Sequence, residues 1–237
     1  TNGNQIQISQ TSGTAIRTTG NLGSADLTLL RASALTDGQY GFDIRYIGSR
    51  TGNANSFALE MHNQTGTNVE AITVYQDGKV GINNTAPSSV LDVGGNTSIT
   101  GNLTLTSTDA GSSAAPTIDL VRDSSSPADA DYLGQIAFKG DDDGGSSHTY
   151  AKITGKISDA SAGTEDGVIE FAVVSNGSNE IVSRFQNNGL FLNTGNTIRF
   201  EGSTADAHET TLTVTDPTAD RTITLPNASG TVALTSD

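Results

Sequence analysis

The residues of this sequence that could do chemistry are three histidines and a few clustered carboxylates. His62, His148 and His208 lie too far apart along the chain to form a short metal-binding motif, and no HExxH, Gly-x-Ser-x-Gly or phosphate-loop motif is present. Cysteine is absent, so a thiolate metal site and a disulfide framework are both excluded. We therefore predict no metal, no cofactor and no catalytic residue, and expect the histidines to face solvent or a subunit interface.

The most concentrated acidic group is the run Asp141, Asp142 and Asp143, which precedes two glycines. Carboxylates on a flexible turn can bind a hard cation such as Ca²⁺. This run, however, lacks the alternating ligand spacing and the terminal Glu of a calcium loop. We predict a solvated acidic turn that blocks edge pairing, with a cation bound between three copies of the turn as the alternative.

A second group of carboxylates, Glu165, Asp166 and Glu170, could supply the acid and base of a glycosidase. The separation that this chemistry requires, about 5 to 9 Å between two carboxyl groups, is a property of the folded chain and not of the sequence. Sugar-cleaving clefts usually contain aromatic platforms, and this chain has no Trp and few other aromatic residues. We predict that the protein is not an enzyme.

Recognition of another molecule without catalysis would use exposed loops, because rigid scaffolds present binding residues on their connections. One polar loop offers Arg50, Asn53 and Asn55, and the acidic turn at residues 141–143 lies close to His148. These residues are the candidates for contact with a receptor. The competing interpretation is that each loop only connects two strands.

The scaffold that positions these residues is limited by its composition. Only 34% of the 237 residues are hydrophobic and 5% are aromatic, which is too little for one large core within a single chain. Charged residues are 16% of the total, and Val, Ile, Leu and Thr alternate with polar residues at a period of two, which favours strands over disorder. We predict an all-β protein built from small modules that share apolar surface between chains.

The charge of the chain limits its partners. Lys and Arg together number 12 against 26 for Asp and Glu, which gives a net charge of −14. Such a surface repels phosphate, so nucleic acid and anionic lipid are poor partners. No apolar run approaches the length of a membrane span, and we expect no membrane insertion.

An internal repeat organises the sequence. Residues 40–48 align with residues 132–140 without a gap and share a Tyr, an Ile, an aromatic residue and a final Gly. Three further pairs of segments match in the same order, namely 27–31 with 118–122, 57–61 with 169–173, and 70–76 with 180–186. Both copies then contain a hairpin signal, Asp77-Gly78 or Asn188-Gly189. We predict two related β-sandwich-like modules, the second with an extra strand pair near residues 141–163.

Simpler Gly-Asn-rich tracts flank the modules. The predicted organisation is an N-terminal stalk segment (1–22), a first module (23–93), a Gly-Asn β linker (94–114), a second module (115–194) and a C-terminal β stalk segment (195–237). In the stalk tracts about one apolar residue per short strand points inward, and one chain cannot close a core in this way. Three chains around an axis could close it. The candidates for the core of such a trimer are Ile99, Leu103, Leu105, Ile198, Leu212 and Val214.

Two motifs resemble segments of bacteriophage tail fibres. The first is YQDGKVGINNTAP at residues 75–87, followed by LDVGGN at residues 91–96, and it is similar to the ends of fibre modules that lead into a Gly-Asn stalk. The second is DRTITLPNASGTVALT at residues 220–235, which is similar to segments of fibres from aquatic phages. The second module departs from the pattern, because it ends GLFLN at residues 189–193 and lacks the Val-Gly-Ile and the Pro.

The resemblance implies an intertwined homotrimeric fibre that belongs to a virion and acts outside the cell as a non-catalytic structural component. Its partners would be other virion proteins and a glycan or protein of the host surface. Two alternatives stay open, a trimeric bacterial or archaeal adhesin or appendage fibre and a tail spike that degrades polysaccharide. An adhesin needs a signal peptide and a membrane anchor, whereas a phage fibre needs an N-terminus that binds the baseplate.

Overall fold

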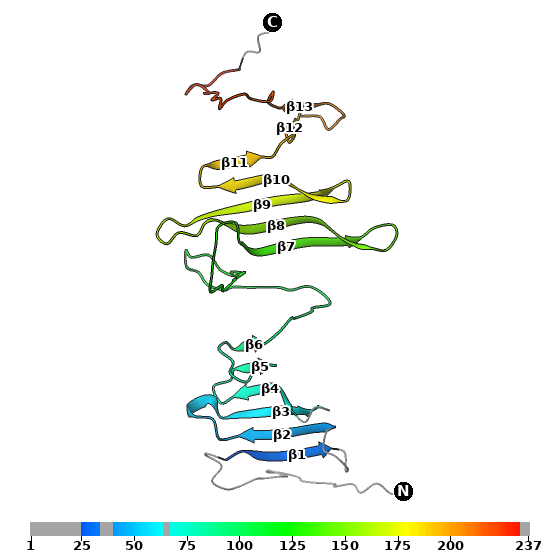
Figure 1. Ribbon diagram of the computed structural model, residues 1–237, viewed down its shortest axis with the longest axis vertical. Coiled ribbons are helices and arrows are strands. Elements are labelled where there is room, and N and C mark those ends of the chain that lie inside the picture. The colour runs from blue at the N-terminus through cyan, green and yellow to red at the C-terminus, as the bar shows by residue number, and fades with distance from the viewer. Residues whose placement is uncertain (1–24, 34–39, 64–66, 233–237) are drawn as a thin grey trace. The chain divides into compact units, whose positions relative to one another are not determined.

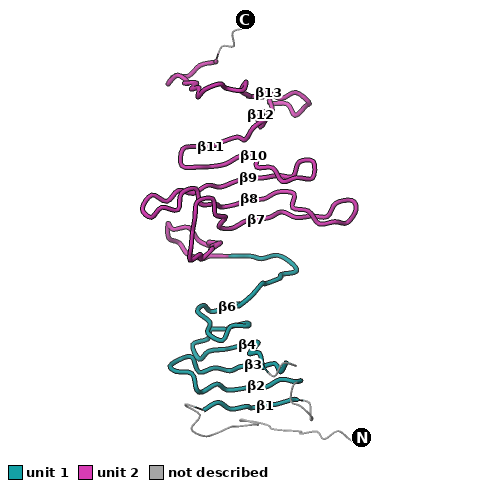
Figure 2. Tube along the Cα trace, viewed as in Figure 1, with its two compact units in different colours: residues 1–105 teal, residues 106–237 magenta. Residues whose placement is uncertain are grey.

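The computed structural model describes residues 25–33, 40–63 and 67–232 of the chain. It divides into two compact units, residues 1–105 and 106–237, with the division inside the predicted linker (Figure 2). Apart from the three-residue 3-10 turn Gly52–Ala54, all regular structure in the described residues is β (Figure 1). The predicted all-β class is confirmed. None of the helical structure in these residues is long enough to cross a membrane.

Unit 1 contains one six-stranded sheet in which the strands lie in chain order (Figure 1). All neighbours are antiparallel except the last pair, β5 and β6, which is parallel. The strands are β1 (Leu27–Ser33), β2 (Gly41–Ile47), β3 (Ser56–His62), β4 (Val69–Tyr75), β5 (Val80–Ile82) and β6 (Leu91–Val93).

Unit 2 contains a five-stranded antiparallel sheet, also in chain order, and a separate two-stranded hairpin. The five strands are β7 (Tyr132–Asp141), β8 (Ser147–Asp159), β9 (Asp166–Ser175), β10 (Ser178–Gln186) and β11 (Gly189–Leu192). The hairpin joins β12 (Ile198–Glu201) to β13 (Glu209–Leu212). Asn176 and Gly177 connect β9 to β10 with φ of 47° and 80°, the left-handed conformations that a two-residue hairpin turn requires.

A β-bulge at the same place in both sheets defines how the units correspond. In unit 1 the extra residue is Ala71 on β4, between the pairs Leu59 with Ile72 and Glu60 with Glu70. In unit 2 it is Val182 on β10, between the pairs of β9 and β10 on either side of it. Aligning the bulges makes β3 equivalent to β9 and β4 equivalent to β10, as the sequence repeat predicts. For β4 and β10, however, the structural alignment is shifted by one residue from the alignment of the sequence repeat.

The other end of the repeat differs from the prediction. The sequence places β2 over β7, but β8 lies between β7 and β9, so β8 is the equivalent of β2 and β7 that of β1. Residues 141–163 therefore supply one long strand, not an extra pair, and residues 118–122 form no strand. Amphipathic strands of period two resemble one another, and only the hairpin connections decide which two become neighbours.

Both main sheets are single layers. No second sheet packs on either of them within the described part of its own unit, so a single chain does not complete a sandwich. Residues 94–114 contain no strand, and β12 and β13 are the only strands among the described residues after 195. The predicted N-terminal stalk segment lies outside the described residues.

Candidate functional site

The sheet of unit 1 has one continuous apolar face. Cross-strand pairing produces two rows, each with one residue from every strand. The first row is Leu30, Ile44, Leu59, Ile72, Ile82 and Val93, and the second is Leu27, Tyr46, Phe57, Val74, Val80 and Leu91. Many of these side chains are open to solvent, with exposed fractions of 51% for Leu30, 44% for Phe57 and 62% for Leu91. We call these two rows the apolar face of unit 1.

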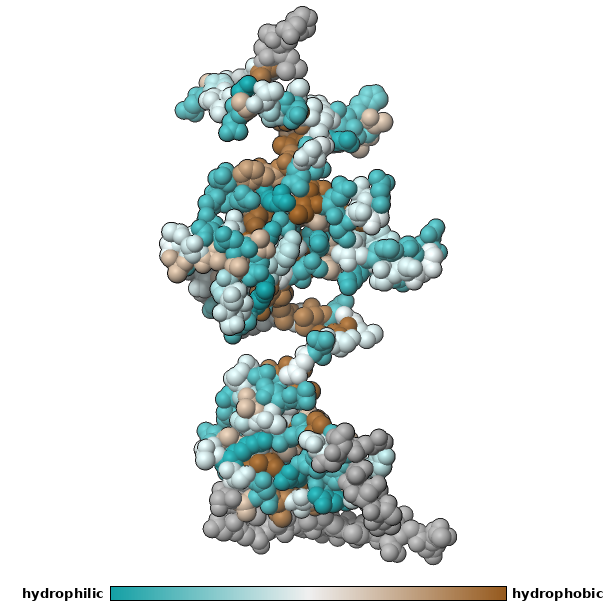
Figure 3. Space-filling model, in the orientation of Figure 1, coloured by the Kyte–Doolittle hydropathy of each residue, from teal (hydrophilic) through white to brown (hydrophobic). Residues whose placement is uncertain are grey.

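Unit 2 has an apolar face built in the same way. One row is Ile136, Ile153, Phe171, Ser183 and Leu192, and the next is Gly134, Gly155, Ile169, Phe185 and Leu190. The rings of Phe171 and Phe185 meet edge to face at 5.8 Å. Ile136, Ile169 and Phe185 are about half exposed. Figure 3 shows apolar side chains at the surface of both units.

Three of the predicted trimer-core residues extend this apolar surface. Ile198, Leu212 and Val214 line one groove of about 600 Å³ together with Leu192, which belongs to the apolar face of unit 2. The other three, Ile99, Leu103 and Leu105, are exposed residues of the strand-free linker, and they belong to unit 1. The six candidates therefore fall into two separate groups.

The opposite face of unit 1 is polar and carries ion pairs between neighbouring strands. Asp43, whose side chain is 1% exposed, accepts hydrogen bonds from Arg31 at 2.8 and 2.6 Å. The Arg31 guanidinium holds the pKa of the Asp43 carboxyl below its usual range; burial opposes this effect, and the nearby His62 adds a further lowering. Arg45 pairs with Glu60 through one terminal nitrogen of its guanidinium. On this face the charged side chains of neighbouring strands are paired with one another.

The sequence predicted that the histidines face solvent or a subunit interface, and His62 does not face solvent. Its side chain is 3% exposed, and its Nε2 lies 3.3 Å from Asp43 Oδ1. The alternation along β3 places it on the polar face, where the ion pairs surround it. His148 and His208 do lie at the surface, with side chains 45% and 88% exposed.

The loop before β3 is held in place by contacts within unit 1, so fewer of its groups are free to contact a receptor than the sequence suggested. Arg50 donates two hydrogen bonds to Glu70, at 2.8 and 3.0 Å, and its guanidinium lies 5.9 Å from the centre of the Tyr75 ring. The backbone carbonyl of Asn55 accepts a hydrogen bond from Gln76 at 3.1 Å. Of the three candidates in this loop, Asn53 is the exposed one.

The acidic turn is organised around Asp142. Its carboxylate accepts hydrogen bonds from the backbone N–H groups of Gly144 and Ser146 at 2.9 and 2.8 Å, and it lies 2.9 Å from His148 Nε2. The Ser146 N–H, followed by His148, lowers the pKa of the Asp142 carboxyl. Asp141 and Asp143 are exposed. Asp142 therefore stabilises the turn itself, and no group of three potential metal ligands gathers among the described residues.

The three carboxylates considered for glycoside hydrolysis do not meet in one pocket. Glu165 accepts a hydrogen bond from the Gly163 N–H at 2.9 Å, which lowers the pKa of its carboxyl, and Asp166 accepts one from Asn187 at 3.2 Å. Both line a depression beside Leu133. Glu170 is buried on β9 and lines a different pocket, where Arg184 Nε donates to it at 3.0 Å.

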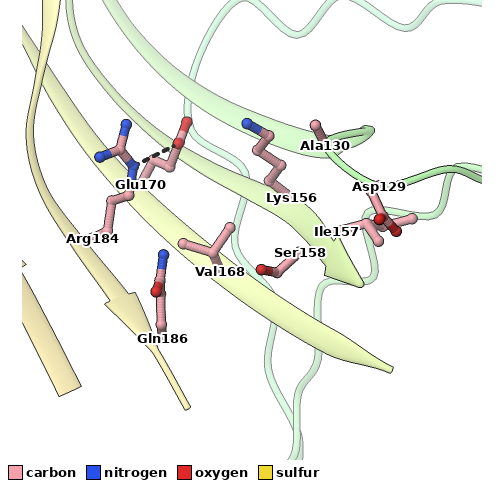
Figure 4. A pocket seen from close by; sticks show the side chains of 9 residues that line it. All are labelled: Asp129, Ala130, Lys156, Ile157, Ser158, Val168, Glu170, Arg184 and Gln186. Atoms are coloured by element: carbon pink, nitrogen blue, oxygen red, sulfur yellow. Dashed lines mark hydrogen bonds and ion pairs between the residues drawn. The ribbon is translucent and has the colours of Figure 1, made fainter. Parts of the chain in front are cut away.

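That second pocket, which we call the polar pocket, is a feature that sequence reasoning missed (Figure 4). It has a volume of about 300 Å³ and lies on the polar face of the unit 2 sheet. Its lining comes from β8, β9, β10 and the segment before β7, and consists of Asp129, Ala130, Lys156, Ile157, Ser158, Val168, Glu170, Arg184 and Gln186. The segment before β7 is fixed there by two backbone hydrogen bonds with Ile157, from Ala130 N and to Asp131 O.

No family model and no curated protein matches this sequence. Among solved structures, the chain is similar to the carboxy-terminal domain of the bacteriophage T5 L-shaped tail fibre, with 13% identity over 92% of this chain and 99% of that one and a TM-score of 0.35. It is also similar to the same domain with its intra-molecular chaperone domain, with 14% identity over 91% of this chain and 69% of that one and a TM-score of 0.35.

Proposed function

We propose that this chain is a structural, non-catalytic segment of a homotrimeric fibre carried by a bacteriophage virion, and that it holds and presents surfaces for recognition of the host. The observation that carries the proposal is the uncovered apolar face. It occurs in both units, at equivalent positions of the two sheets, whereas only four hydrophobic residues are buried in the described part of the chain: Ile47, Ala58, Val168 and Ala172.

An apolar face of this extent favours self-association. Apolar patches on monomeric proteins are usually small, and a large one marks a surface that another molecule covers. Burying a large aliphatic or aromatic side chain contributes about 1.5–3 kcal/mol. Copies of the same chain arranged around an axis would bring each apolar face against its own equivalents and leave the polar faces outside.

The resemblance of residues 75–96 and 220–235 to tail-fibre motifs favours three copies and a virion location outside the cell. The carboxylates support a structural role, because Asp43, Glu70 and Glu170 are each paired with an arginine. Other virion proteins would bind the ends of the fibre, and a host glycan or protein would contact its polar side.

The mass of the purified chain in solution tests the proposal. Size-exclusion chromatography with light scattering should give three times the 24.3 kDa of one chain at micromolar concentration. A monomer or a dimer would contradict the trimer. Incubation with polysaccharide from susceptible cells should release no reducing ends, and turnover that disappears in a Glu170→Gln variant would identify a depolymerase instead.

A further inference from the structure

The polar pocket of unit 2 has a closed counterpart in unit 1. With the bulges aligned, Ile47, Ser56, Ala58, Thr73 and Tyr75 occupy the positions of Lys156, Val168, Glu170, Arg184 and Gln186. In unit 1 the Arg50 side chain covers this place, because it donates to Ser56 Oγ and Glu70 and lies over the Tyr75 ring. In unit 2 no described side chain covers the equivalent position, and the polar pocket is open there.

Several groups in the polar pocket have hydrogen-bonding capacity to spare. Glu170, 4% exposed, receives one hydrogen bond, at Oε1, and no described residue donates to its second oxygen. The Lys156 ammonium lies 5.1 Å from the centre of the Tyr132 ring and forms no ion pair with a described carboxylate. The Gln186 amide bonds to no described residue. Lys156 and Gln186 are partly exposed, so water can bind them, and their free donors and acceptors can equally bind a ligand.

The charges in the pocket select the class of ligand. Lys156 and Arg184 are balanced by Glu170 and Asp129, so neither an anion nor a cation is favoured. Donors and acceptors line the pocket together with one apolar side chain, Val168, which is 8% exposed. Hydroxyl groups both donate and accept, and a sugar ring also presents C–H groups to an apolar surface.

We infer that the polar pocket binds one neutral sugar residue of a surface glycan. The inference rests on the proposed function, since covering the apolar face leaves the opposite face of β9 in solvent. Its volume is at the lower end for small-molecule pockets, which fits one residue held weakly, in the millimolar range, or about −4 kcal/mol. Repetition of the pocket in three chains would raise the avidity without new contacts.

Saturation-transfer NMR on the full chain tests the inference, with the methyl glycosides of glucose, galactose, mannose and N-acetylglucosamine as probes. At least one should receive saturation at concentrations up to tens of millimolar. Lys156→Met should raise its Kd about tenfold or more, or about 1.4 kcal/mol. Gln186→Tyr, which installs the unit 1 residue, should do the same by filling the pocket. Lys152→Met is the matched control, because Lys152 lies on the same strand and face but outside the pocket.

The outcomes separate the two proposals. A trimer that binds no neutral probe contradicts the pocket inference and leaves the fibre proposal standing, whereas a chain that is not a trimer contradicts the fibre proposal. Loss of binding in Lys152→Met as well as Lys156→Met would place the sugar elsewhere. Preference for the methyl glycoside of glucuronic acid or of glucosamine over all neutral probes would overturn the assignment of a neutral ligand.

Discussion

The two units of this chain keep one face of their sheets alike and differ in the other. Both have the bulge between equivalent strands, and both have an apolar face made of cross-strand rows. On the polar face, unit 1 carries several arginine–carboxylate pairs and is closed by Arg50, whereas the sheet strands of unit 2 carry the pair of Glu170 with Arg184 beside an open pocket. The apolar face, which both units share, is therefore suited to assembly. The polar face, which differs between the units, is suited to a role that only one of them has.

The largest effect is expected from a charge on the shared face. Leu59→Asp in unit 1 and Phe171→Asp in unit 2 change equivalent residues, and each would bury three unpaired carboxylates against one another in a trimer. We expect each to cost about 4 kcal/mol or more per subunit and to abolish the trimer. Light scattering and thermal melting measure both effects.

Asn53→Asp is the control for these two variants, since it adds the same charge to an exposed loop. It should remain trimeric. If Leu59→Asp dissociates the chain and Phe171→Asp does not, the two apolar faces are not equivalent in assembly.

A smaller effect is expected from Asp43→Asn, which tests the ion pairs of unit 1 that unit 2 lacks at this place. The variant should lose about 1–3 kcal/mol of unfolding free energy, a value limited by the exposure of Arg31. The folded pKa of Asp43 is lowered, so its contribution is present above the unfolded value of about 3.9 and is lost as the pH falls through the folded value. Urea unfolding at fixed protein concentration should show a gap between variant and wild type at neutral pH that shrinks in acid.

Asp77→Asn is the matched control, because Asp77 forms an ion pair with Lys79 at 2.8 Å on the surface. It should change stability little at any pH. A gap for Asp43→Asn that stays constant from neutral pH to about pH 2 would show that the ion pair is not its source.

The smallest effect is expected in the linker, where Leu103→Gln changes one exposed residue and no sheet row. If Leu103 lies in a trimer core, three amide groups become buried and the trimer should weaken by about 1–2 kcal/mol per subunit. The concentration at which the trimer dissociates, measured by analytical ultracentrifugation, should rise. No change would restrict the trimer core to the sheets and the groove at Ile198.

Local patterns in the sequence determined the strand content and most turns. The period-two alternation predicted an all-β chain. The Asp77-Gly78 signal lies at the connection of β4 to β5, whereas the Asn188-Gly189 signal is one residue beyond the turn, which is Asn187-Asn188, since Gly189 begins β11. Such signals are legible because a turn depends on the conformations of two or three adjacent residues. The sequence repeat also predicted the equivalence of β3 with β9 and of β4 with β10. The exposed apolar residues Ile198, Leu212 and Val214 were identified from the same alternation.

Only the tertiary structure decided which strands are neighbours and what each polar side chain does. The pairing of β8 with β9, the cover that Arg50 forms, the burial of His62 and the polar pocket all depend on residues far apart in the sequence. Alternation assigns a residue to one of two faces, but it does not say which strand lies beside it. The charges that pair or remain free are set by that neighbour, and so the polar face, unlike the apolar one, could not be derived from the sequence.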